Sequence, residues 1–348
     1  MRRRPGFVVL VGVLAVLVTG IVSALSGAAG IGVWAALSDV LARLPGGAGT
    51  NLSSLDAALL WQIRVPRVVL SAMVGGALGL CGCAYQGAFR NPLVDPYLLG
   101  SAAGAGLGAT LAIVYLPGVR GWIVNPLPLF AFVGAMTAVA LSFAVGHLGS
   151  GSGSTGARRD PTRLVLGGVA VASFFTALQT FAQQQGDDTL RLVYSWILGG
   201  LVTSGWSQVL LILPYLAVCA TVILAHSRLL DVLSVGDDEA RTLGVSPERI
   251  RTTVVIAASL GTAAAVAVSG LIGFVGLVVP HVVRLVFGSS HRISLPGSAL
   301  FGAAFLVLAD LAARSILSPR ELPIGVVTAF VGAPFFAWLL IRQGRPRS

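Results

Sequence analysis

The chain has 348 residues, of which 55% are hydrophobic and only 10% charged, with a mean hydropathy of +0.89 and a net charge of +10. A soluble domain carries about 25% charged residues, so the composition excludes an ordinary soluble protein and indicates an integral membrane protein. The chain contains no lysine, and because a P-loop needs a lysine to reach the nucleotide phosphates, a standard P-loop ATPase is excluded as well.

Ten apolar stretches follow one another along the chain, and each is long enough, or nearly so, for a membrane-spanning helix. We expect spans at 7–28, 68–89, 97–116, 126–148, 164–185, 206–226, 252–270, 271–288, 297–317 and 323–341. The region 252–283 has no formal charge and is longer than a single span, which needs about 20 residues. Its glycines Gly270, Gly273 and Gly276 therefore predict a tight turn inside it. The sequence therefore predicts an all-α polytopic membrane protein with about ten transmembrane helices in a single domain, 1–348.

The first apolar stretch resembles a secretory signal peptide, because it follows the basic residues Arg2, Arg3 and Arg4. The uncharged run at 5–36 is too long for a signal-peptide core of about 7–15 residues, which favours a retained first span. Arginines between the spans are in excess on the side of this N-terminal cluster, and cytoplasmic loops carry such an excess. We therefore expect a multi-pass protein of the cytoplasmic membrane with both termini in the cytoplasm.

A polar turn, FRNPLVDPYLLG at 89–100, separates the second and third predicted spans. Pro92 disfavours helix at Asn91 and ends the second span, and Pro96 is expected to restart the chain into the third. Asp95 has two open roles: it caps the third helix or it pairs with Arg90.

The longest polar segment, 226–251, predicts two short helices. Acidic residues at 237–239 suit a helix N-terminus, Leu243-Gly244 offers a helix stop, and Ser246-Pro247-Glu248 is typical of the start of another helix. The segment is either an ordinary connector or a docking element for a partner. The Gly/Ser-rich segment at 149–163 is expected to be a flexible linker.

A few polar side chains fall inside the predicted spans. Gln179 and Gln183 share a helix face, and because an unpaired amide in hydrocarbon costs several kcal/mol, they must face other helices or a wet translocation path, which we favour. Asp310 is the one carboxylate well inside a span. An ion pair with Arg314, four residues later, is preferred to a proton relay.

Several motifs occur in an order and spacing that resemble the FecCD-type permeases, the membrane subunits of type II ABC importers for iron-siderophores, haem and cobalamin. The resemblance covers roughly 60–344, and the C-terminal third is especially similar to the cobalamin-transporting members. The motifs are RVPR (64–67), GALGLCGCAYQGAFRNPLVDPYLLG (76–100), SWILGGL (195–201), ARTLGV (240–245), GLIGFVGLVVPHVVRL (270–285), HRISLPG (291–297), LADLAAR (308–314) and ELPIGVVTAFVGAPFFAWLL (321–340).

The resemblance implies a type II importer permease fold, a permease homodimer, two cytoplasmic ATPase subunits and an extracytoplasmic substrate-binding protein. ATP and Mg²⁺ would bind to the ATPase subunits. This chain would then bind no cofactor or metal of its own, would not be an enzyme by itself and would have no nucleic-acid partner.

The resemblance also implies roles for particular residues. Arg64, Arg67 and Arg314 would pair with glutamates of the binding protein, and Asn91 and Leu93 would form the cytoplasmic gate. The segment at about 227–251 would dock into the ATPase as a coupling loop, with contacts from Gly236, Asp237, Asp238, Glu239, Ala240, Arg241, Leu243 and Gly244.

The function expected from these observations is ATP-driven import of a metal chelate or cobalamin by alternating access. The alternative from another class is a proton-coupled secondary transporter that uses Asp310 or His281. A membrane enzyme is a third reading, although the sequence shows no nucleophile paired with a base. The substrate stays open between siderophore, haem and cobalamin.

Overall fold

A computed structural model describes residues 5–26, 38–39, 53–116, 126–148, 161–185, 189–201 and 205–343 of the chain. Within these ranges the structure is helical and contains no strand. Ten helices correspond to the ten predicted spans, which confirms the predicted fold class: α1 (Pro5–Leu25), α4 (Val65–Phe89), α5 (Ser101–Tyr115), α6 (Pro126–Leu148), α7 (Pro161–Gln183), α9 (Ser207–Ala225), α12 (Pro247–Ser269), α13 (Val275–Phe287), α14 (His291–Ser315) and α15 (Ile324–Gln343).

By length and composition, seven helical segments of the described chain are able to cross a membrane, and α5, α13 and α15 are shorter apolar helices. The second predicted span is the end of a continuous helical segment, Ser54–Phe89, of 36 residues. It comprises α3 (Ser54–Ala58), a π-helical segment η1 (Leu59–Arg64) and α4. The predicted linker at 149–163 lies mostly outside the described residues.

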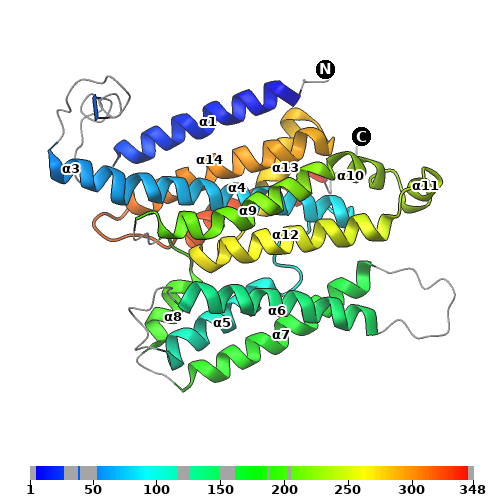
Figure 1. Cartoon of the computed structure of the whole chain (residues 1–348), viewed down its shortest axis with the longest axis horizontal. Helices are drawn as coiled ribbons and strands as arrows, with labels where there is room; N and C mark the ends of the chain where they lie inside the picture. Colours follow the sequence, from blue (N-terminus) through cyan, green and yellow to red (C-terminus); the bar gives the residue numbers. More distant parts are fainter. Residues whose placement is uncertain are drawn as a thin grey trace.

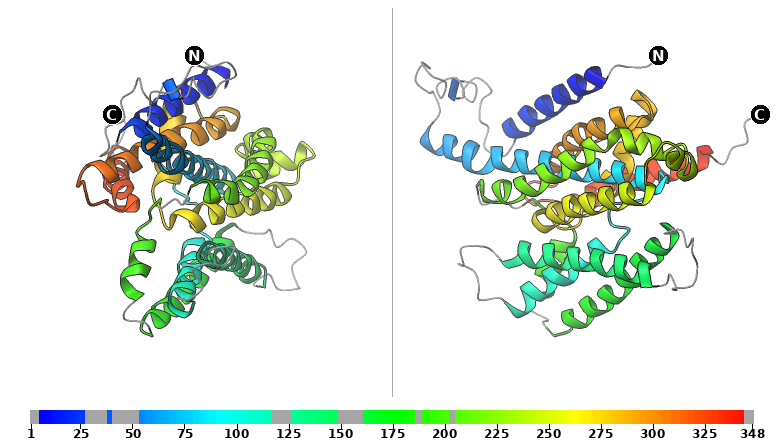
Figure 2. Two further views of the ribbon diagram at one scale, coloured as in Figure 1. Left: turned by 60° about the vertical axis from the view of Figure 1, so that its left-hand side comes forward. Right: turned by 45° about the vertical axis from the view of Figure 1, so that its right-hand side comes forward.

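The helices form two groups (Figure 1). The short helix α8 (Leu190–Ile197) lies with α5, α6 and α7 on one side, and α1, α4, α9, α12, α13 and α14 form the other group. The right-hand view of Figure 2 shows the same separation. The start of α1 lies toward the end of the bundle that holds the short helices α10 (Ser227–Leu233) and α11 (Asp237–Thr242), whereas α3 lies at the opposite end.

Glycines bring α4 and α14 into direct backbone contact. A Cβ on Gly75 would lie 2.3 Å from the carbonyl oxygen of Gly302, and a Cβ on Gly79 would lie 2.2 Å from that of Ser298. Small residues permit such close approach between membrane helices. A similar contact joins α5 and α6, where a Cβ on Gly104 would lie 2.2 Å from the Gly134 carbonyl oxygen.

The predicted break near Gly270 is confirmed. Helix α12 ends at Ser269, Gly270 adopts a φ of +67°, and α13 begins at Val275. A Cβ at Gly270 would lie 2.1 Å from the Trp196 carbonyl oxygen, so the turn requires glycine for its conformation and for its close contact with α8.

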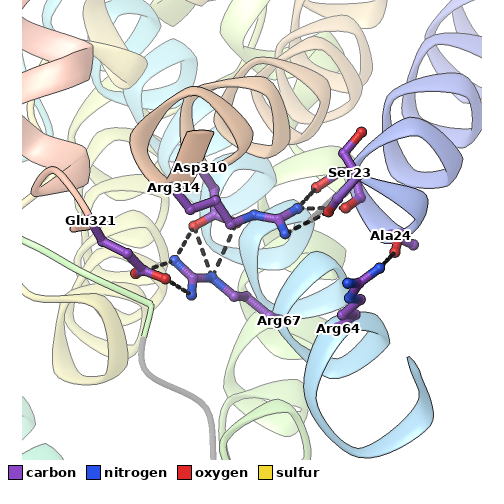
Figure 3. A network of polar contacts seen from close by, with 8 residues as sticks. Ser23, Ala24, Arg64, Arg67, Asp310, Arg314 and Glu321 are labelled. Atoms are coloured by element: carbon purple, nitrogen blue, oxygen red, sulfur yellow. Dashed lines mark hydrogen bonds and ion pairs between the residues drawn. The ribbon is translucent and has the colours of Figure 1, made fainter. Parts of the chain in front are cut away.

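The π-helical segment η1 precedes Pro66. Proline has no N–H to donate to the carbonyl four residues earlier, and π-bulges are one way in which a helix accommodates such a local change. Arg64 is the last residue of this segment and Arg67 lies in the first turn of α4, so both are at the end of α4 that follows α3. Figure 3 shows the two side chains.

Candidate functional site

At the α3 end, two arginines and two carboxylates form a cluster around Arg67, here called the arginine–carboxylate cluster (Figure 3). Arg67 Nε donates to Asp310 Oδ1 at 3.0 Å, and its Nη2 donates to the same oxygen at 2.9 Å. The other side of the guanidinium meets Glu321, with Nη1 to Oε1 at 3.0 Å and Nη2 to Oε2 at 2.9 Å. Arg314 Nε lies 3.4 Å from Asp310 Oδ2, which confirms the predicted i, i+4 pair.

Burial differs sharply between the two carboxylates of the cluster. The Asp310 side chain is fully buried and that of Glu321 is 53% exposed. The Arg67 hydrogen bonds hold the pKa of Glu321, which lies between α14 and α15, below its ordinary value. Asp310 sits between two guanidinium groups, and a buried carboxylate requires such compensation.

Two of the arginines at this end also cap the C-terminus of α1. Arg314 donates to the carbonyl oxygens of Ser23 and Ser26, the latter at 3.0 Å, and to Ser23 Oγ at 2.7 Å. Arg64 Nη1 donates to the carbonyl oxygens of Ala24 and Leu25 at 3.3 and 3.4 Å. The last carbonyls of a helix have no partners within it, and arginines here satisfy them where the helix dipole is negative.

The three arginines predicted to dock a binding protein therefore gather at one end, but each is engaged within the chain. Arg67 and Arg314 side chains are only 16% and 13% exposed. Docking by these residues stays a prediction. Any partner carboxylate that approached Arg67 would compete with Glu321, the more exposed of its two partners.

At the opposite end, the turn after α4 is built around Asn91. Arg90 caps α4 with a left-handed φ of +52°, and Asn91 Oδ1 accepts a hydrogen bond from Leu93 N at 2.9 Å. Asn91 is exposed and Leu93 is 45% exposed, so both predicted gate residues lie on an accessible turn. Their role as a gate stays a prediction.

Both roles considered for Asp95 are wrong. Its Oδ1 accepts from Tyr97 N at 2.8 Å within a turn, and α5 begins only at Ser101, later than predicted, after a Gly100 with φ +77°. Arg90 instead lies 3.3 Å from Asp237 Oδ1. Burial raises the pKa of Asp95 to about 6.

The polar segment at 226–251 forms α10 and α11, and its last residues begin α12. Helix α11 ends at Thr242, and the helix stop that the sequence predicted at Leu243-Gly244 is confirmed, since Gly244 has φ +77° and its N–H donates to the Arg241 carbonyl oxygen at 2.9 Å. Ser246 precedes α12, with Pro247 in its first turn, so this start belongs to a long span rather than to a short helix. Ala240 is buried, whereas Leu243 is 69% exposed.

Asp237, the first residue of α11, lies between two arginines. Arg251 Nη2 donates to Asp237 Oδ1 at 3.1 Å, and Arg90 Nη2 is 3.3 Å from the same oxygen. Arg251 Nε also donates to the Ala88 carbonyl oxygen at 2.9 Å, at the end of α4. We call Arg90, Asp237 and Arg251 the Asp237 bridge.

A second carboxylate joins α10 to the start of α14. Asp231 accepts hydrogen bonds from the backbone N–H of His291 at 2.6 Å and from Ser290 Oγ at 2.8 Å. Although burial opposes it, these hydrogen bonds hold the pKa of Asp231 below its ordinary value. The first turn of a helix has free N–H donors, so Asp231 fixes α10 to α14.

The amides predicted on a translocation path lie on α7. Gln179 faces α5 closely enough that a Cβ on Gly106 would lie 2.6 Å from its Oε1. Gln179 and Gln183 are both half-buried. Their contact with a substrate path stays a prediction.

The described residues show no group of three or more His, Cys, Asp or Glu side chains that could hold a metal ion. Cys81 and Cys219 are free, buried thiols with their sulfurs 3.7 Å apart. His281 packs edge-on against Phe335, with ring centroids 6.0 Å apart.

Sequence reasoning missed Glu321, Asp231 and Arg251. Glu321 lies 254 residues from its partner Arg67, Asp231 lies 60 residues from His291, and Arg251 lies 163 residues from Ala88. Spacing along the chain could not reveal these contacts, because each joins residues that are far apart in sequence.

Comparison with known proteins finds relatives that match most of the chain. The model of the FecCD transport family matches residues 12–342. The chain is 44% identical over 283 residues to the cobalamin import system permease protein BtuC of Halobacterium salinarum, covering 81% of this chain and 73% of that protein. It is 38% identical over 304 residues to the hemin transport system permease protein HmuU of Yersinia pestis, covering 86% and 88%.

A solved metal-chelate type ABC transporter in an inward-facing conformation has the same fold. The TM-score is 0.82 at 29% sequence identity, and the match covers 97% of this chain and 99% of that one.

Proposed function

The chain belongs to the FecCD transport family, and from this premise we propose that it translocates a metal chelate or cobalamin by alternating access, driven by a separate ATPase. The observation that carries this proposal is the family match over residues 12–342 on a ten-helix chain. The chain is thus a permease subunit of an ABC importer. Its hydrolytic site would lie on the partner, in keeping with the missing P-loop lysine.

The proposed assembly is a permease homodimer with two ATPase subunits at the α10–α11 end and a binding protein at the α3 end. The α10–α11 end would face the cytoplasm, together with both termini. Two exposed apolar side chains support docking there, since Val235 and Leu243 are 70% and 69% exposed beside α11. Exposed apolar side chains on a polar loop suit a protein–protein contact.

The arginine–carboxylate cluster supports structural roles for Arg67 and Arg314. Arg64 also binds the end of α1, but it stands outside this cluster, so it is the better probe of binding-protein docking. Reversal of Arg67 would set a third carboxylate against Asp310 and Glu321. The docking test therefore uses Arg64→Glu, which should weaken binding-protein capture by the purified permease complex. Unchanged capture at physiological salt would count against docking through Arg64.

Proton coupling through Asp310 is not supported. The carboxylate is fully buried and bound by Arg67 on one side, with Arg314 on the other, and the family is one of ABC transport. Its geometry instead suits a structural anchor between α4 and α14.

The substrate is best identified through the complete importer. The chain, its ATPase and its binding protein would be reconstituted in vesicles and offered cyanocobalamin, haemin and a ferric siderophore separately. We expect uptake of one class, dependent on both ATP and the binding protein. Uptake that persists with an inactive ATPase and follows a proton gradient would refute the proposal.

A further inference from the structure

The Asp237 bridge connects the short helix α11 to the turn that holds Asn91 and Leu93. We infer that this bridge transmits displacement of α11 to that turn, with Arg90 and Arg251 as positioning residues. The inference rests on the proposed function, because it assumes that α11 moves with a docked ATPase and that the turn closes the path.

Arg90 joins the Asp237 bridge directly to the turn through the backbone. Arg90 is the C-cap residue that follows α4, and it directly precedes Asn91. Its side chain reaches Asp237 Oδ1 at 3.3 Å. A shift of α11 therefore acts on the chain one residue away from the turn, and α4 and α11 need no intermediate element to communicate.

Arg251 is the buried member of the Asp237 bridge. Its side chain is 8% exposed, and Asp237 is its carboxylate partner at 3.1 Å. Removal of one member of a buried pair leaves an uncompensated charge, so α11 cannot leave Arg251 without a replacement. Arg251 also binds the Ala88 carbonyl oxygen at 2.9 Å. When α11 moves, Asp237, Arg251 and the end of α4 are therefore expected to move together.

The short helices α10 and α11 are attached to different helices of the bundle. Asp231 fixes α10 to the first turn of α14 through His291 and Ser290. Helix α10 is thus held to one helix while the start of α11 is held to another. The loop that joins the two short helices has Gly236, with φ +156°, and is a suitable place for the change in angle.

Arg90 is the residue to change, because it is 40% exposed and its loss leaves Asp237 paired with Arg251. Asp237→Asn is less informative, since it leaves the buried Arg251 without its carboxylate partner. Arg90→Gln keeps a long polar side chain but removes the charge. Arg90→Lys retains the charge, and Arg292→Gln removes an exposed arginine from the same end of the bundle.

The experiment uses the complete importer in vesicles, with the ligand that its binding protein captures among cyanocobalamin, haemin and a ferric siderophore. The measured quantity is ligand molecules transported per ATP hydrolysed, together with the amount of ATPase that co-purifies. Coupling between two sites typically changes affinity by about 5-fold or more, and we take this as the scale of the effect. We expect Arg90→Gln to lower the ratio by that factor or more, with normal co-purification, and Arg90→Lys and Arg292→Gln to keep it.

Two results would overturn the inference. One is an unchanged ratio in Arg90→Gln, including the case in which transport and ATP hydrolysis fall in parallel, and the other is an equal loss in Arg292→Gln. If the unaltered importer shows no ATP-dependent uptake, the proposed function itself fails. Wild-type uptake with an unchanged Arg90→Gln ratio overturns the link alone.

Discussion

The arginine–carboxylate cluster allows a matched pair of substitutions, because Asp310 and Glu321 bind the same guanidinium at the same distances but with different burial. Asp310 accepts from Arg67 at 2.9 and 3.0 Å and is fully buried. Glu321 accepts at 2.9 and 3.0 Å and is 53% exposed. Each change, Asp310→Asn and Glu321→Gln, removes one negative charge with almost no change in volume.

The expected costs differ because solvent can replace only the exposed partner. Removing one partner of a buried ion pair costs about 3–5 kcal/mol, and Asp310 also balances Arg314. An exposed pair contributes about 0–1 kcal/mol, which applies to Glu321. Asp310→Asn should therefore lower the free energy of unfolding by about 3 kcal/mol, and Glu321→Gln by less than about 1 kcal/mol.

The assay is unfolding of the purified protein in detergent by titration with a denaturing detergent, followed by tryptophan fluorescence. Uptake per folded complex is measured in parallel. We expect Asp310→Asn to keep transport in its folded fraction. Equal destabilisation by the two substitutions would refute the reasoning from burial, and complete loss of transport in well-folded Asp310→Asn would favour proton chemistry at this residue.

Three further predictions concern other parts of the chain. Arg314→Gln removes charged hydrogen bonds to the end of α1, each worth about 1.5–3 kcal/mol, and should speed hydrogen exchange near Ser23 while exchange in α12 is unchanged; equal rates throughout would contradict a clamp on α1. Leu93→Ala should raise passive leak of ligand from vesicles, and a Leu93→Ala permease whose vesicles show no added leak would argue against a gate at this turn. The folded-state pKa of Asp95 is raised to about 6, so the native state binds more protons than the unfolded state between about pH 4 and 6, and the free energy of unfolding should fall as pH rises through that window. Asp95→Asn should flatten this pH dependence, and an identical slope in the variant would assign the dependence to other groups.

Local patterns predicted the ten helices well, because hydropathy over about 20 residues reflects the membrane itself. The break at Gly270 and the stop at Gly244 were also predictable, since glycine at positive φ is a local requirement. The start of α5 was placed too early, because Pro96 and Asp95 form a separate turn before Ser101.

Side-chain partners across the fold could not be predicted in the same way. Asp310 has an arginine four residues away, so the sequence pointed to Arg314, whereas the closer contact is with Arg67 from another helix. The role of Arg251 was equally hidden, because its partners Asp237 and Ala88 meet only when α4, α11 and α12 pack together. Distances of this kind depend on the tertiary arrangement rather than on spacing along a helix.

The glycine contacts between α4 and α14, and between α5 and α6, have a mechanical consequence. Backbones this close cannot slide past each other without steric overlap, so each pair should move as one stiff unit. By contrast, α12 meets α5 and α6 through an alanine-rich cluster that also contains Val266, and larger side chains such as Phe132 and Met136 pack against it. Small sliding of packed helices is one form that conformational changes take, and this surface of side-chain contacts is where we expect it. A covalent tether between α4 and α14, or between α5 and α6, should leave the transport rate unchanged. A tether across the alanine-rich surface, between α12 and α5 or α6, should abolish transport.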